Sequence, residues 1–133
     1  MTRNKESDNG LMNLKSNYSV QETAARLETA LKGRGLRLFA RIDHSAAAAE
    51  SGVEMRPTEV LLFGNPAIGT PMMLAAPTLA IDLPFKGLVW QDSSGQVWLT
   101  YNTPEYLSNR HHVPKSLVGE LNGLPELMGE IVK

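Results

Sequence analysis

The sequence predicts an α+β fold: a two-layer α/β sandwich in which helices lie on a mixed sheet of about five strands, in the order β-α-β-α-β-α-β-β-α-α. Three observations lead to this prediction. Segments with the two-residue alternation of strands take turns along the chain with segments that have helical spacing. Two strand-like segments, 86–92 and 96–102, flank a short glycine turn, which is typical of a β-hairpin. The length of 133 residues is also usual for one domain.

The most regular helical segment begins after Ser19. Ser19 and Glu22 have the spacing of a capping box, which closes the first turn of a helix with side-chain hydrogen bonds. The apolar residues that follow are four, three and four positions apart, so they share one helix face; they are Val20, Ala24, Leu27 and Leu31. Gly33 and Gly35 are expected to end this helix.

Strands are predicted at 11–19, 36–42 and 56–64, before the hairpin. In the segment 36–42, Leu36, Leu38, Ala40 and Ile42 are expected on one face and Arg37, Phe39 and Arg41 on the other. That alternation indicates a half-buried strand. The segment 56–64 is apolar enough for a central strand, and Gly95 is placed for a positive φ in the hairpin turn.

Shorter helices are predicted between and after the strands. The alanine-rich segment 43–52 forms one, and 70–76 forms another, with Thr70 as its N-cap and a proline in its first turn. The segment 103–112 repeats the Thr-Pro start. The stretch 77–85 is consistent with a continued helix and with an extended segment.

The chain is predicted to consist of a disordered leader (1–10), one α/β domain (11–113) and a C-terminal helical extension (114–133). Thirteen basic residues against 14 acidic ones leave a net charge of −1, so no strong field draws the protein to nucleic acid or to an anionic membrane. No apolar run approaches the roughly 20 residues of a membrane-spanning helix. Because the N-terminus has no signal-peptide pattern, we expect a cytoplasmic protein. The absence of cysteine excludes thiolate chemistry and cysteine metal sites.

A set of short segments carries a family resemblance: Ile42-Asp43-His44, Phe63-Gly64-Asn65-Pro66, Gly69-Thr70-Pro71, Asp82-Leu83-Pro84 and Tyr101-Asn102. With them, residues 11–113 resemble the domain-of-unknown-function 302 family of bacteria and archaea. The resemblance implies a small compact α/β domain that commonly pairs as a homodimer. It implies no assigned activity.

The stretch FGNPAIGTPMM (63–73) joins an apolar strand to a predicted helix. Backbone N–H groups at such a junction can bind an anion, which makes Gly64, Asn65, Gly69 and Thr70 candidate ligand-binding residues. Neither the Walker pattern nor G-x-G-x-x-G is present, so a nucleotide is not indicated. Turn chemistry explains the same residues without a ligand. Both interpretations stay open.

Asp43 and His44 directly follow an alternating strand. Functional groups are often exposed at strand ends in α/β folds, and a histidine can act as acid, base or ligand near neutral pH. The alternative is that Asp43 or Ser45 caps the alanine-rich helix while His44 lies beside it.

Asp82 lies within the apolar stretch LAIDLPF (79–85). A carboxylate in such surroundings must be paired or must have a raised pKa. If it faces a pocket unpaired, Asp82 is a general-base candidate. As a structural residue it would accept backbone N–H bonds or pair with Arg41 or Lys86.

His111 and His112 close the predicted helix 103–112, where the helix dipole favours cationic side chains. A metal or acid/base set of His44, Asp82 and His111 is a further alternative, but it lacks the close spacing of metal-binding motifs. We therefore assign no metal site, and no motif in the sequence names a cofactor.

We expect a homodimer that binds a small molecule, anionic if the turn is its site, in a cleft built from the 64–70 loop, Asp43-His44 and Asp82. The dimer would cover the sheet face that helices leave open, and Trp90 and Trp98 are expected to pack in the core or in that interface. The first alternative is a small enzyme that uses Asp82 or His44 as general acid/base. The second is a structural or protein-interaction domain.

Overall fold

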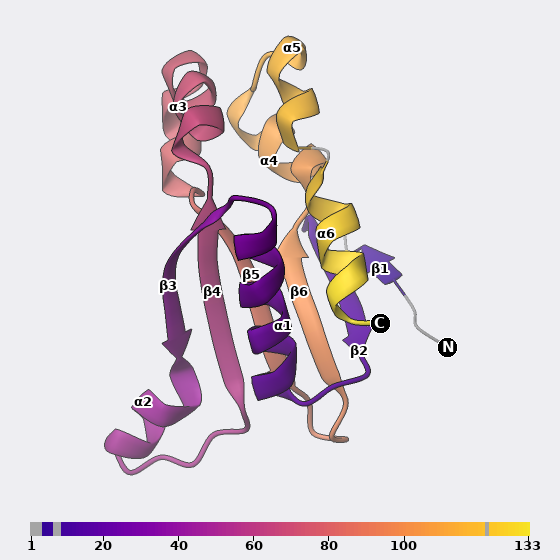
Figure 1. Ribbon diagram of the computed structural model, residues 1–133. Coiled ribbons are helices and arrows are strands. Elements are labelled where there is room, and N and C mark those ends of the chain that lie inside the picture. The colour runs from indigo at the N-terminus through magenta and orange to yellow at the C-terminus, as the bar shows by residue number, and fades with distance from the viewer. Residues whose placement is uncertain (1–3, 7–8, 122) are drawn as a thin grey trace.

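The computed structural model, described for residues 4–6, 9–121 and 123–133, contains one sheet of six strands in the order β1-β2-β6-β5-β4-β3 (Figure 1). The strands are β1 (Asn4–Glu6), β2 (Leu11–Ser16), β3 (Arg37–Asp43), β4 (Thr58–Gly64), β5 (Phe85–Gln91) and β6 (Val97–Asn102). Helices lie on one face of the sheet and beyond its ends, and the predicted α+β sandwich is confirmed.

All strand pairs within the described residues are antiparallel, so the expectation of a mixed sheet is wrong. The connections explain the difference. The chain turns back at an end of the sheet between β3 and β4, through α2 (His44–Glu50), and again between β4 and β5, through α3 (Pro66–Ala75). These helices lie beyond the strand ends and do not cross the sheet, as a parallel connection would require.

The first long helix, α1 (Val20–Gly33), begins where the sequence predicts. Ser19 is its N-cap, and the Ser19 hydroxyl accepts the backbone N–H of Glu22 at 3.0 Å. The helix ends before Gly35, which has a φ of 70°. Its buried face contains the predicted apolar residues, which are Val20, Ala24, Leu27 and Leu31. Local capping and spacing were therefore sufficient to define this helix.

Two helices from distant parts of the chain, α1 and α6 (Gly123–Ile131), cover the same face of the sheet (Figure 1). They meet over Gly87 of β5. A Cβ atom at this position would lie 2.8 Å from Cδ2 of Leu27 in α1 and 3.3 Å from Cε of Met128 in α6. Both side chains are fully buried, so the two helices approach the sheet closely only because residue 87 has no side chain.

The hairpin of β5 and β6 closes as predicted, with Gly95 at a φ of 91°. Asp92 organises its turn by accepting the indole N–H of Trp98 at 2.9 Å and the hydroxyl of Ser94 at 2.7 Å. These hydrogen bonds, led by the one from Trp98, lower the pKa of Asp92 to about 2. The carboxylate is thus charged at neutral pH, the form that accepts all of these donors.

Short helices form a cap beyond one end of the sheet. They are α3, the 3₁₀ helix η1 (Pro77–Ile81), α4 (Pro104–His111), α5 (Lys115–Val118) and the 3₁₀ turn η2 (Gly119–Leu121). The cap has a core of its own, formed by Met72, Ala76, Leu79, Leu107, Val113 and Leu121. The stretch 77–85 thus begins as a tight helix and becomes strand at Phe85, after a cis peptide bond at Pro84.

The start of α3 differs from the prediction. The helix begins at Pro66 with Asn65 as its N-cap, so Thr70 is not the cap but lies inside the helix. The sequence contains two pairs of a capping residue followed by proline, Asn65-Pro66 and Thr70-Pro71. The first pair follows directly on β4 and starts the helix, since its proline already has the φ of a first helical residue.

A β-bulge in β3 changes the predicted faces of that strand. Leu38 pairs with Phe63 and Ala40 with Leu62, which leaves Phe39 as the extra residue. Because the bulge shifts the alternation by one position, Leu38 and Ala40 lie on opposite faces of the sheet. The prediction that they share a face is wrong.

The two ends of the chain are more closely tied to the sheet than expected. In the predicted disordered leader, residues 4–6 form β1, antiparallel to β2, while residues 1–3 and 7–8 lie outside the described part. The predicted extension 114–133 contains α5, η2 and α6, and it contributes to the main core: Leu124, Leu127, Met128 and Ile131 of α6 are buried there, with Val132 after the helix. Within residues 4–6, 9–121 and 123–133, no helix is both long and apolar enough to cross a bilayer.

The face of the sheet opposite α1 and α6 carries apolar side chains on its central strands. The strand registers place Ile42, Val60 and Leu88 in one row and Trp90 and Trp98 in another. The two tryptophan rings stack with centroids 6.4 Å apart. These side chains are partly or largely exposed, so this face, which we call the outer face, is an apolar surface.

We expect Gly87→Ala to lower the free energy of unfolding by about 1–3 kcal/mol, because the new methyl group collides with buried Leu27 and Met128. Urea unfolding would measure the change. Gly119→Ala is the matched control, since a Cβ at Gly119 meets no described atom within 4 Å. Equal stability of the two variants would contradict the close approach of α1 and α6 to the sheet.

Candidate functional site

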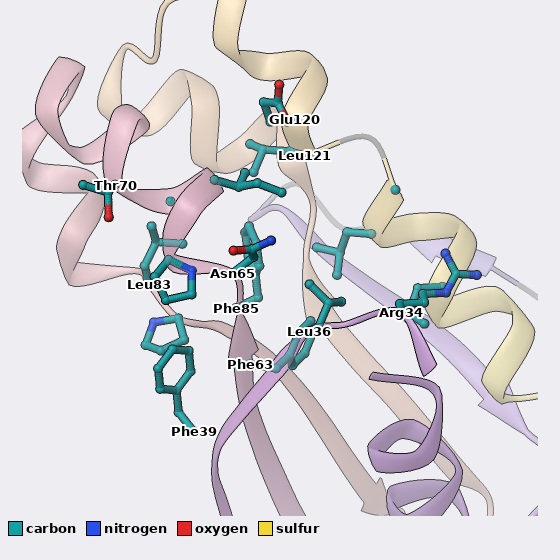
Figure 2. A pocket seen from close by; sticks show the side chains of 18 of the residues that line it. Arg34, Leu36, Phe39, Phe63, Asn65, Thr70, Leu83, Phe85, Glu120 and Leu121 are labelled. Atoms are coloured by element: carbon teal, nitrogen blue, oxygen red, sulfur yellow. The ribbon is translucent and has the colours of Figure 1, made fainter. Parts of the chain in front are cut away.

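A cavity of about 410 Å³ opens where the sheet meets the cap (Figure 2). Its wall comes from the start of β3 and β5, the end of β4, and the helices α3, η2 and α6. Most of the lining side chains are apolar: Leu36, Phe39, Phe63, Ile68, Met73, Leu83, Pro84, Phe85, Leu121, Leu124 and Leu127. This volume and lining are typical of sites that bind small molecules.

The cavity lies between the two hydrophobic cores of the protein. Phe85 is half-buried and packs against both of them. Its ring lies 6.1 Å from that of Phe63, tilted by 48°. Phe39, the bulged residue of β3, adds a third aromatic ring to the wall. The space therefore exists because two separately packed units meet at the end of the sheet.

Four of the predicted ligand-binding residues line this cavity: Gly64, Asn65, Gly69 and Thr70. The predicted anion cradle is not formed there. The N–H of Ala67 donates to the side chain of Asn65 at 3.0 Å, and those of Ile68 and Gly69 donate to its carbonyl at 2.9 Å. Pro66 has no N–H, so the first turn of α3 keeps no free backbone donor for an anion.

Asp43 and His44 lie at the opposite end of the sheet, at the start of α2 (Figure 1). Because β3 and β4 are antiparallel, the end of β3 and the end of β4 point in opposite directions. Asp43 caps α2: it accepts the hydroxyl of Ser45 at 2.6 Å and the N–H of Ala46 at 2.9 Å, and these bonds lower its pKa. The expectation of one cleft that includes Asp43-His44 is wrong.

Asp82 is close to the cavity but does not line it, although its neighbours Leu83 and Pro84 do. Its carboxylate accepts two bonds from the guanidinium of Arg110, at 3.0 and 3.2 Å, and lies 2.5 Å from Nε2 of His111. It is thus a paired carboxylate, which was one of the two interpretations. Its side-chain partners differ from the predicted Arg41 and Lys86.

The predicted partners of Asp82 are engaged elsewhere. Lys86 donates to the backbone carbonyl of Asp82 at 3.2 Å, and not to its carboxylate. Arg41 binds Glu59 at 2.7 Å and Glu28 at 3.3 Å. The bond to Glu59 is the main cause that raises the pKa of Arg41, because it favours the charged guanidinium.

His111 links Asp82 to η1. Its Nδ1 lies 2.8 Å from the hydroxyl of Thr78, while its Nε2 faces Asp82. The cluster of Thr78, Asp82, Arg110 and His111 therefore ties η1 to the end of α4. The alternative metal set is not assembled, because His44 lies at the other end of the sheet; the described residues contain no group of three or more potential ligands among His, Asp and Glu.

Sequence reasoning missed most of the cavity wall. Phe39, Phe85 and Leu124 come from three elements far apart in the chain and have no common motif. One signal was available: Phe39 is a large apolar side chain placed among arginines in the strand pattern of 36–42. Such a residue on the predicted polar face indicates a bulge or a contact that alternation does not describe.

The sequence of this chain matches a known protein family. The family described as "Domain of unknown function DUF302" matches residues 12–127. The chain belongs to this family. The match extends through the cap and into α6, which agrees with the place of α6 in the core of the DUF302 domain.

Two relatives extend the comparison of this DUF302 chain. "Fluoride-specific ion channel FluC 1" of Brucella suis is 45% identical over 104 residues, which are 78% of this chain and 41% of that protein. "Fluoride-specific ion channel FluC 2" of Brucella melitensis has the same identity over the same length, with 38% of that protein covered. The chain thus spans about two fifths of the length of these relatives.

A solved structure supports the fold. The crystal structure of an uncharacterized conserved DUF302 protein from Bacillus stearothermophilus superimposes with a TM-score of 0.76. The similarity covers 92% of this chain and 95% of that chain at 18% sequence identity. The DUF302 fold is thus retained at low sequence identity.

Asp82→Asn is expected to lower the free energy of unfolding by about 1–3 kcal/mol, because it removes the negative charge and one acceptor oxygen that face Arg110 and the buried His111. Thermal unfolding would measure the loss, with Glu50→Gln on the exposed side of α2 as control. We expect a smaller loss for Arg110→Gln, whose side chain is 49% exposed. If Asp82→Asn behaved like the control, the cluster would not tie η1 to α4.

Proposed function

We propose that this domain binds a small, mainly apolar molecule in the cavity at the end of the sheet. The observation that supports this most directly is the cavity itself: about 410 Å³, with three phenylalanines and several aliphatic side chains in its wall. Transfer of an apolar surface from water into such a wall gains roughly 25 cal/mol per Å². The ligand would therefore be held mainly by desolvation and contact, and not by charge.

A binding role has more support than a catalytic one. The two acid/base candidates, Asp82 and His44, do not line the cavity. Asp82 is paired with Arg110 and His111, and His44 lies at the far end of the sheet. A general acid or base must come within hydrogen-bond reach of the reacting group, and neither residue is placed for that in a ligand held by the cavity.

The Brucella relatives suggest a setting for such a domain. In them, the matched region makes up about two fifths of a protein named as a fluoride-specific ion channel. We propose that this domain acts as a ligand-binding module that can also occur joined to other segments of a longer chain. Ligand binding in the cavity would then change how the domain contacts the neighbouring segments of such a chain.

The binding proposal is tested with a neutral fluorescent probe, N-phenyl-1-naphthylamine, whose emission rises in apolar sites. We expect the wild-type protein to bind it, and Gly69→Leu to weaken binding by at least about tenfold, or 1.4 kcal/mol. A side chain at Gly69 would enter the cavity, since its Cβ would lie 3.6 Å from Cδ1 of Leu83.

Gly129→Leu is the matched control for this experiment. Gly129 is also inside a helix, but a Cβ there meets no described atom within 4 Å and the residue does not line the cavity. Its affinity for the probe should stay unchanged. Equal weakening by both substitutions, or no binding by the folded wild-type protein, would contradict the proposed site.

We also propose that two copies of the chain pair through the outer face. The face carries Val60, Leu88, Trp90 and Trp98, and both helices that pack on the sheet lie on its other side. An exposed apolar surface of this kind marks an interaction site in many proteins.

Sedimentation of the purified protein tests the pairing. We expect a particle of twice 14.6 kDa at micromolar concentration. Leu88→Lys should return it to the monomer, because a charge would be buried in the centre of the interface. Ala25→Lys, on the exposed side of α1, should leave the dimer intact. A wild-type protein that sediments as a monomer would overturn this proposal.

A further inference from the structure

Asn65 contributes the amide group in a cavity wall that is otherwise largely apolar. It follows Gly64 at the end of β4 and precedes the first residue of α3. Figure 2 shows its side chain among the lining residues, between Leu83 and Leu36. A ligand that covers such a polar group removes it from water. The affinity therefore depends strongly on whether the ligand replaces the lost hydrogen bond.

The orientation of the Asn65 amide is determined by its capping role. Its Oδ1 accepts the N–H of Ala67 at 3.0 Å, and only the oxygen of the amide can accept this bond. The Nδ2 group is therefore the other branch of the amide, and it carries two N–H donors. Among the described residues, no hydrogen bond from Nδ2 to a protein acceptor is formed. This donor group remains available to a ligand.

The other polar side chains of the wall favour a neutral ligand. Arg34 is already paired with Glu130 at 2.7 Å. Glu120 brings a carboxylate to the wall, which would repel an anion. The backbone donors at the start of α3 are bonded within the helix, so an anionic ligand would meet no unpaired donor from that turn.

From these contacts we infer that Asn65 determines which ligand the cavity binds. The ligand is a neutral molecule with an aromatic or aliphatic body and one acceptor oxygen, such as a carbonyl. This oxygen accepts a hydrogen bond from Nδ2 of Asn65. This inference rests on the proposed binding function and states which class of ligand the cavity prefers. The rings of Phe39, Phe63 and Phe85 suit a flat aromatic body, since aromatic groups pack well in offset or edge-to-face contacts.

The test uses two compounds that differ at one position. In 2-acetylnaphthalene a carbonyl group occupies the position of a methylene group in 2-ethylnaphthalene, and the rest of the molecule is the same. Titration of each against the wild-type protein gives the ratio of the two dissociation constants. Asn65→Asp keeps an oxygen that caps α3 but removes the N–H donors.

We expect the preference for the ketone over the alkyl compound to fall by about 3- to 10-fold in Asn65→Asp relative to wild type, as for the loss of one hydrogen bond. Because the preference is a ratio, an effect of the substitution that is equal for both compounds cancels. Asn17→Asp, the same change at an exposed residue between β2 and α1 that does not line the cavity, should leave the preference unchanged. Asn65→Gly, which is tolerated at an N-cap and has neither a side-chain donor nor a charge, should lower the preference in the same way, and it serves if Asn65→Asp does not fold.

Two further results separate this inference from the proposed function. If wild type and Asn65→Asp bind both compounds with the same preference, the cavity binds apolar molecules but Asn65 does not select them, and the inference is overturned. If the folded wild-type protein binds neither compound nor the naphthylamine probe, the proposed function itself fails.

Discussion

The fold depends on the close approach of two helices to the sheet over Gly87. Leu27 from α1 and Met128 from α6 meet above this glycine, so the first and last helices share one core. With α1 and α6 both on one face, the outer face keeps its apolar rows uncovered, and α2, α3, α4 and α5 lie beyond the ends of the sheet. The open face and the separate cap are thus two consequences of the same packing.

The cavity is in turn a consequence of the separate cap. Main core and cap core are separate clusters of buried residues, and the half-buried Phe85 packs against both. Between them remains a space whose wall is apolar on both sides. The cluster of Asp82, Arg110 and His111 contributes from outside, since it holds η1 against α4 and so positions Leu83 and Pro84 in the wall. Asp82, the general-base candidate of the sequence, therefore supports the site without lining it.

Two differences between prediction and structure show where local patterns fail. Asn65-Pro66 and Thr70-Pro71 are equally good helix starts, and only the position directly after β4 decides in favour of the first. In β3, the alternation of apolar and polar residues hides a bulge at Phe39, which depends on the register with β4. In both cases the deciding contact lies in a neighbouring element, and within the segment 36–42 the large apolar side chain of Phe39 among arginines is the signal of the bulge.

By itself the sequence determined the elements and most of their ends: the capping of α1 by Ser19, of α2 by Asp43 and of α4 by Thr103, and the hairpin turn at Gly95. These features depend on residues within a few positions of one another, so they can be derived from spacing. The tertiary structure alone decided that Asp43 and Asn65 lie at opposite ends of the sheet, and which side chains pair with Asp82. Those outcomes follow from antiparallel pairing and from contacts across 28 or more residues, which local spacing does not encode.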